Sequence, residues 1–161
     1  MIGMMNGKKR GRPAKQVPET TDEAIRLVKA VVKEYKQLKE FCSFIPRRRR
    51  SMFQVLNIHT EGYEESGCIS YNQELVDRIP QRDRDVVLNY EKAMKKVWIL
   101  EHGIASIPDG RTKAIANDTL IDGIPVLRLL QKYGIGKTQL FWEKDRAIKY
   151  VAQFLSKCHC E

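Results

Sequence analysis

IDGIPVLRLLQKYGIGKTQLFWEKDRAIKYVAQFL, which spans residues 121–155, has the pattern of two helices joined by a tight turn. Pro125 suits the first position of a helix, where its missing N–H would have no partner in any case. Apolar residues then recur at helical spacing, at Val126, Leu129, Leu130 and Tyr133. Gly134 supplies the left-handed residue that ends this helix, and Gly136 can cap a second helix beginning at Lys137.

The second helix separates into an apolar face and a polar face. We expect the inward residues to be Leu140, Ala147, Ile148, Val151 and Leu155. We expect the outward residues to be Lys137, Thr138, Gln139, Phe141, Lys144 and Lys149. With a preceding short helix over 111–121, the pattern favours a helix-turn-helix over about 111–155. The alternative is an ordinary antiparallel helical hairpin, because short helix–glycine–helix connections are common.

Part of this stretch resembles region 4 of bacterial sigma factors, which reads the promoter −35 element. The positions that match without a gap are the turn Tyr133–Gly136, then Leu140, then the run Arg146–Ile148, then Val151. A similar ending occurs in phage late-gene transcription regulators of the ArpU and RinA type. The departures are at the cap, where Gly136 replaces the usual Ser or Thr, and at Phe141 and Trp142, where the family often has Arg and Gln.

The resemblance implies that the second helix enters the major groove of double-stranded DNA, with RNA polymerase as a possible partner. Candidates for base or phosphate contact are then Lys137, Thr138 and Gln139. Candidates for phosphate contact are Lys144, Lys149 and Arg146, although Arg146 has an intramolecular pair as its alternative. Phe141 can contact a thymine methyl group, or it and Trp142 can pack against another helix.

Positive charge is concentrated at the start of the chain. Residues 1–50 hold 14 Lys and Arg against 5 Asp and Glu, whereas the remaining residues hold 15 of each. A localised basic arm of this kind indicates a polyanionic partner, most often nucleic acid. The polar, proline-containing segment 1–20 is predicted to be disordered.

The basic arm contains an AT-hook-like motif. Its core is Arg10-Gly11-Arg12-Pro13, flanked by Lys8, Lys9 and Lys15. A narrow A·T minor groove has a deepened negative potential that attracts Arg, and Gly lets the backbone approach the groove floor. The alternative is a generic basic tail that binds phosphates without preference.

A long amphipathic helix is predicted over 21–46, opened by a capping box between Thr20 and Glu23. It should run to about Phe44, before Pro46. A heptad seam runs along it through Ala24, Val28, Val31, Tyr35, Leu38, Cys42 and Ile45. This seam is either a homodimer interface over 22–45 or a surface that docks on the C-terminal body. A basic run follows, formed by Arg47, Arg48, Arg49 and Arg50. It either contacts DNA phosphates or forms a solvated loop.

Residues 47–72 are predicted as a basic run and irregular linker, with a possible short strand where Met52, Gln54, Leu56 and Ile58 alternate with other residues. The helical domain is expected over 73–161. Within it, Asn72 caps a short helix through Ile79, and a long helix runs from about Gln81 to His102 and ends at Gly103.

Several classes of protein are disfavoured. The chain has no P-loop, G-x-G-x-x-G, G-x-S-x-G or H-E-x-x-H motif, so we expect no enzyme and no cofactor. Cys158-His159-Cys160 has the wrong spacing for a zinc knuckle, so no metal site is expected. Without a signal peptide or a bilayer-length apolar run, we expect a protein of the bacterial host cytoplasm with reduced thiols.

These patterns together predict a mostly α-helical DNA-binding protein with a C-terminal helix-turn-helix and a disordered basic arm. The expected function is sequence-specific transcription regulation of the phage late-gene type, with one duplex bound through both grooves. Two alternatives are open. One is a phage DNA-packaging protein, similar to a small terminase, that oligomerises through 22–45. The other is an architectural protein that binds A·T-rich DNA through the arm alone.

Overall fold

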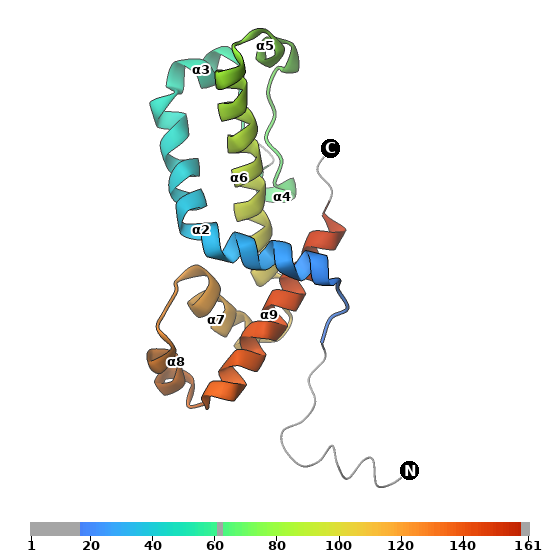
Figure 1. The fold of residues 1–161 in the computed structure, drawn as a ribbon, viewed down its shortest axis with the longest axis vertical. Coiled ribbons are helices and arrows are strands. Elements are labelled where there is room, and N and C mark those ends of the chain that lie inside the picture. Colours follow the sequence, from blue (N-terminus) through green and yellow to red (C-terminus); the bar gives the residue numbers. More distant parts are fainter. Residues whose placement is uncertain (1–16, 61–62, 159–161) are drawn as a thin grey trace.

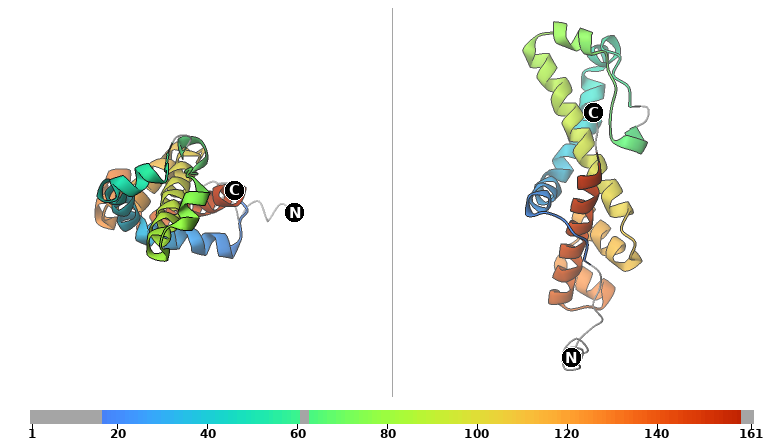
Figure 2. Two further views of the ribbon diagram at one scale, coloured as in Figure 1. Left: turned by 90° about the horizontal axis from the view of Figure 1, so that it is seen from above. Right: turned by 90° about the vertical axis from the view of Figure 1, so that its right-hand side faces the viewer.

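The computed structural model describes residues 17–60 and 63–158, and most of them are helical. The helices are α2 (Asp22–Arg48), α3 (Arg50–Val55), α4 (Tyr63–Ser66), α5 (Gln73–Arg78), α6 (Gln81–Ala105), α7 (Gly110–Ala116), the single π-helical turn η1 (Asn117–Ile121), α8 (Val126–Tyr133) and α9 (Lys137–Lys157). The molecule is elongated, with α3 and α5 at one end and α8 at the other (Figures 1 and 2). The expected mostly α-helical class is therefore confirmed.

The central core joins three long helices that are far apart in the sequence. Figure 1 shows that α2 bends: its first half crosses α6 and α9, and its second half runs beside α6. Ala24 and Val28 of α2 are buried in one cluster with Leu100 of α6 and Val151 of α9. Burial of such apolar side chains is the main source of folding free energy.

The heptad seam of α2 lies within this chain. Tyr35 is buried, and Val31, Leu38 and Cys42 pack against the same core cluster. The Tyr35 hydroxyl donates to Glu101 of α6, and Lys39 Nζ lies 2.5 Å from the same carboxylate oxygen. The seam therefore docks on the C-terminal body within the chain, with Ala24, Val28 and Tyr35 buried and the other seam residues partly buried.

Both ends of α2 differ from the prediction. The cap is Thr21, whose hydroxyl accepts from the Ala24 N–H at 3.1 Å, and Thr20 is not the cap. The helix also continues through Pro46 to Arg48. A proline inside a helix removes one backbone hydrogen bond, and its ring crowds the carbonyl four residues earlier. Helical bonding continues beyond Pro46 to the C-cap, where the Arg49 N–H donates to the Ile45 carbonyl at 2.8 Å.

The expected strand near 52–58 is wrong, and residues 47–72 are not simply an irregular linker. Residues 50–55 form α3, which buries Phe53 against Tyr90 of α6 in an edge-to-face contact with ring centroids 5.0 Å apart. Leu56, three residues on, is also buried. This helical spacing outweighs the weak alternation. In the described parts of the chain the only β-type pairing is an isolated bridge between His59 and Ser70.

The long helix α6 does not end at Gly103 but continues to Ala105. Gly103 instead allows α9 to approach closely, since a Cβ at this position would lie 3.0 Å from Val151 Cγ1 and 3.3 Å from Val151 Cα. The shorter helix α5 begins as predicted, with the Asn72 side chain accepting from the Leu75 N–H at 3.2 Å.

The cysteines are not all reduced thiols, which corrects the sequence-based expectation. Cys42 and Cys158 are free, but Cys68 is disulfide-bonded. Burial raises the pKa of Cys42 to about 11, with Glu101 adding to the rise and Lys39 opposing it.

Candidate nucleic-acid interface

Three helical segments form a small unit at the end of the molecule that carries α8. The first is α7 continued by η1, which matches the helix predicted over 111–121 except that it begins at Gly110. The second and third are α8 and the first half of α9. Ile115, Leu129 and Leu140, one from each segment, are buried together as the unit's core.

The connection between α8 and α9 has the predicted form. Gly134 adopts φ 62° and ψ 39°, and its N–H donates to the Leu130 carbonyl at 2.9 Å. This left-handed conformation is one that glycine adopts without the penalty paid by other residues. Gly136 is the N-cap of α9, as expected. Pro125, by contrast, is the N-cap of α8 and not its first helical residue.

A buried polar cluster fixes α9 against α7. Thr112, Glu143 and Arg146 are all buried, and the Thr112 hydroxyl donates to Glu143 Oε1 at 2.9 Å. The Arg146 guanidinium donates to both Thr112 and Glu143 and lies 3.5 Å from Asp109. Asp109 also caps α7 by accepting from the Arg111 and Thr112 N–H groups. Arg146 thus makes the intramolecular pair that was the alternative to phosphate contact.

A second polar cluster fixes α8 against η1. Asp118 Oδ2 accepts from Lys132 Nζ at 2.7 Å and from the Tyr133 hydroxyl at 2.5 Å. Burial raises the pKa of the Asp118 carboxyl, but the hydrogen bonds from Lys132 and Tyr133 outweigh burial and hold the pKa below its ordinary value. The Arg111 guanidinium adds a bond to the Tyr133 carbonyl at 3.1 Å.

The first turns of α9 project a polar and aromatic surface into solvent. Lys137 and Thr138 are exposed and Gln139 is half-buried. Phe141 and Trp142 are 48% and 54% exposed, so neither packs in the core. Lys137 Nζ lies 5.9 Å from the Phe141 ring centroid.

Farther along α9, the two other predicted phosphate contacts differ in their surroundings. Lys144 is half-buried and faces a groove beside α2. Lys149 lies 3.0 Å from Asp145 in an exposed i,i+4 ion pair. Leu155, expected inside, is only partly buried against the central core.

The arginine run Arg47–Arg50 lies at the opposite end of the molecule from α8 (Figure 1). Arg49 pairs with Asp83 of α6 at 3.2 Å. Arg48 lies over the Phe44 ring at 5.6 Å, and Arg47 Nε donates to the Ser43 carbonyl at 3.3 Å. Since α6 alone is about 37 Å long, the structure does not bring these arginines together with the start of α9.

The hook residues Lys8, Lys9, Arg10, Gly11, Arg12, Pro13 and Lys15 lie outside the described residues, as do His159 and Cys160. Sequence reasoning missed Lys29 and Lys33 of α2, which line the groove beside Lys144. Their four-residue spacing shows a shared outer face. Only the packing of α2 on α9 shows that this outer face of α2 lies beside Lys144.

Comparison with known proteins adds no relative, because no family model, curated protein or solved structure matches the chain. Among the described residues, no group of three or more His, Cys, Asp and Glu side chains is placed to hold a metal ion. No described helix has the length and apolar character needed to cross a bilayer.

Proposed function

We propose that this protein is a sequence-specific regulator of transcription that binds double-stranded DNA through a helix-turn-helix formed by α8, the turn at Gly134–Gly136, and α9. The N-terminal half of α9 would be its recognition helix. The observation that carries the proposal is the division of α9: Lys137 and Thr138 are exposed, whereas Leu140 and Ala147 of the same helix are buried.

The exposed chemistry suits a major groove. A glutamine such as Gln139 can form a bidentate pair with adenine, a lysine can contact guanine or phosphate, and Phe141 can contact a thymine methyl group. No side chain caps the α9 N-terminus. Its first N–H groups are therefore open to a phosphate oxygen, which helix N-termini bind readily.

Polar contacts between helices hold the frame behind this surface. The cluster of Thr112, Glu143 and Arg146 fixes the rotation of α9 on α7, and Asp118 fixes α8 through Lys132 and Tyr133. The side chains of a binding site must be held to within about 0.5 Å and about 10–20° of the productive geometry. This arrangement supports specific reading over passive phosphate binding.

The biological role follows from the resemblance to sigma region 4 and to phage late-gene regulators. The proposal includes action in the bacterial host cytoplasm, contact with RNA polymerase, and a minor-groove contribution from the arm at Arg10–Arg12. The packaging alternative relied on oligomerisation through 22–45, and the use of Ala24, Val28 and Tyr35 of that seam in the chain's own core supports the regulator.

The test is in vitro selection of bound duplexes from a random library at physiological salt, with the full-length protein. A defined motif, with or without an adjacent A·T tract, is the expected result. Enrichment of A·T content alone would contradict the proposal and favour the architectural alternative. If no sequence were enriched, the proposal that the protein recognises a DNA sequence would be wrong.

The base-reading assignment is tested on the selected duplex with Gln139→Ala. We expect binding to the selected duplex to weaken by about 1–3 kcal/mol, and the sequence preference to relax at only one base pair of the site. Gln153→Ala, on the same helix about four turns away, is the matched control and should leave the preference unchanged. A uniform loss over all sequences would show that Gln139 does not read a base.

A further inference from the structure

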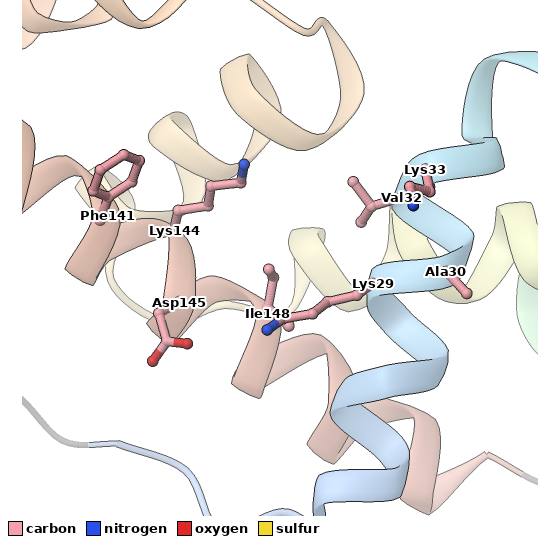
Figure 3. A pocket seen from close by; sticks show the side chains of 8 residues that line it. All are labelled: Lys29, Ala30, Val32, Lys33, Phe141, Lys144, Asp145 and Ile148. Atoms are coloured by element: carbon pink, nitrogen blue, oxygen red, sulfur yellow. The ribbon is translucent and has the colours of Figure 1, made fainter.

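An open groove of about 620 Å³ separates the first half of α2 from the first half of α9. Figure 3 shows Lys29 reaching from α2 toward Ile148 of α9, and Lys144 extending from α9 toward α2. Lys33, Phe141 and Asp145 also line the groove. The two walls are more than 100 residues apart in the sequence, so only the fold creates this surface.

The groove is positively charged. Lys29, Lys33 and Lys144 make no ion pair with any other residue in 17–60 or 63–158. The only acid on its walls, Asp145, is 3.0 Å from Lys149 and is therefore already matched. Ammonium groups that line one groove without counter-charges favour an anionic occupant.

The groove is also continuous with the proposed recognition surface. Phe141 and Lys144 lie one and two turns beyond Lys137 on α9, about 6 and 10 Å along the helix axis. A helix in a major groove, which is about 12 Å wide, has a phosphodiester strand along each side. Because α2 flanks α9 on this side, one of those strands would pass between the two helices.

We infer that this groove receives the sugar–phosphate backbone of the strand that borders the major groove occupied by α9, with Lys29, Lys33 and Lys144 contacting its phosphates. The lysines match the phosphates, and the apolar floor formed by Val32 and Ile148 matches the deoxyribose edges. α2 is then a second DNA-contacting helix that positions the duplex without reading its sequence. This inference rests on the proposed function and extends it to a surface outside the helix-turn-helix.

The test compares two double variants of equal charge. Lys29→Ala/Lys33→Ala removes two groove lysines. Lys92→Ala/Lys157→Ala removes two exposed lysines, on α6 and at the end of α9, that do not line the groove. Affinity for the selected duplex and for an unrelated duplex is measured from 50 to 200 mM salt, and circular dichroism checks that each variant is folded.

Each lost phosphate contact should reduce the slope of log affinity against log salt by about 0.9. The slope of the groove variant should therefore be smaller in magnitude by about 1.8. Its affinity should fall equally for both duplexes, so its preference for the selected duplex should be unchanged. The control should keep the wild-type slope. Lys29→Arg/Lys33→Arg should restore the slope. A groove variant that behaves like the control overturns the inference.

The two failures are distinguishable. If wild type selects a motif but the groove variant keeps its slope, only the inference fails. If wild type shows no motif, the proposed function fails, and the inference about α2 fails with it. An unchanged DNA slope together with loss of binding to a poly-glutamate peptide would assign the groove to an acidic protein segment instead, which also overturns the inference.

Discussion

Arg146 and Glu143, one turn apart on α9, form an ion pair inside the molecule, with side chains only 8% and 5% exposed. Thr112 of α7 hydrogen bonds to both partners. An arginine placed in this way is a poor candidate for phosphate contact. Its function is to fix the rotation of α9, and thus the direction in which Lys137, Thr138 and Gln139 point.

Arg146→Ala should lower the free energy of unfolding by about 3–5 kcal/mol, because it removes the cation that faces a buried carboxylate. Urea denaturation followed by circular dichroism measures this change. Lys149→Ala, which breaks the exposed pair with Asp145, should cost less than about 1 kcal/mol. Arg146→Ala with wild-type stability and weakened DNA binding would contradict the structural role.

Gly103→Ala should destabilise the protein by about 1 kcal/mol. The methyl group gains about 0.5–1 kcal/mol of helix propensity, but overpacking against Val151 costs about 1–3 kcal/mol. Gly110→Ala is the control, because a Cβ at the start of α7 has nothing within 4 Å. Thermal unfolding of both variants checks the difference, and a Gly103→Ala protein at least as stable as wild type would show that Val151 yields without cost.

Asp118 should make stability depend on pH on the acid side. Its pKa is below the ordinary value in the folded state, since the hydrogen bonds from Lys132 and Tyr133 outweigh the effect of burial. The folded state therefore gains stability above the unfolded pKa, and this gain is lost as the pH falls through the folded pKa. Asp118→Asn should be less stable than wild type at pH 7, and the gap should shrink below about pH 4. Unfolding free energies at pH 7 and pH 3 measure the gap, and a constant gap would exclude this carboxylate as its source.

Arg12→Ala should weaken binding and reduce any preference for A·T tracts beside the selected motif, because the hook-like motif predicts an arginine in the narrow minor groove. Competition binding with A·T-flanked and G·C-flanked duplexes at physiological salt gives the readout. Lys15→Ala is the control. Because Lys15 is expected to contact phosphate only, this substitution should weaken binding to both duplexes equally. If Arg12→Ala bound both duplexes with unchanged affinity, the proposed minor-groove contact of the arm would be wrong.

The parts of the fold that sequence reasoning predicted are those set by short-range signals. Gly134 and Gly136 define the turn because their roles depend on local backbone geometry. The α2 seam was visible as a repeat, although its partner was not, since a heptad pattern carries no information about what covers it. Gln139 and Phe141 were placed outside by helical period alone, and they are half-buried and exposed respectively.

The parts that were missed depend on contacts between distant segments. Gly103 is read as a helix stop in isolation, but its purpose is to admit Val151 from α9. Pro46 lies inside α2, and residues near it, Cys42 and Ile45, pack in one cluster with Tyr90 of α6. Arg49 looked like one of four equivalent arginines, and only the approach of Asp83, more than 30 residues later, makes it different.

The placement of Ala24 and Val28 in one core with Leu100 and Val151 has a practical consequence for dissecting this protein. A fragment beginning at residue 73 would keep every residue of the α7–α9 unit, yet it would expose the apolar faces of α6 and α9 that α2 covers. If such a fragment failed to bind DNA, the result could not be assigned to the missing contacts of α2 or of the arm, because the packing that supports α9 would be lost at the same time. The proposed recognition surface is therefore best tested by point substitutions in the full-length chain.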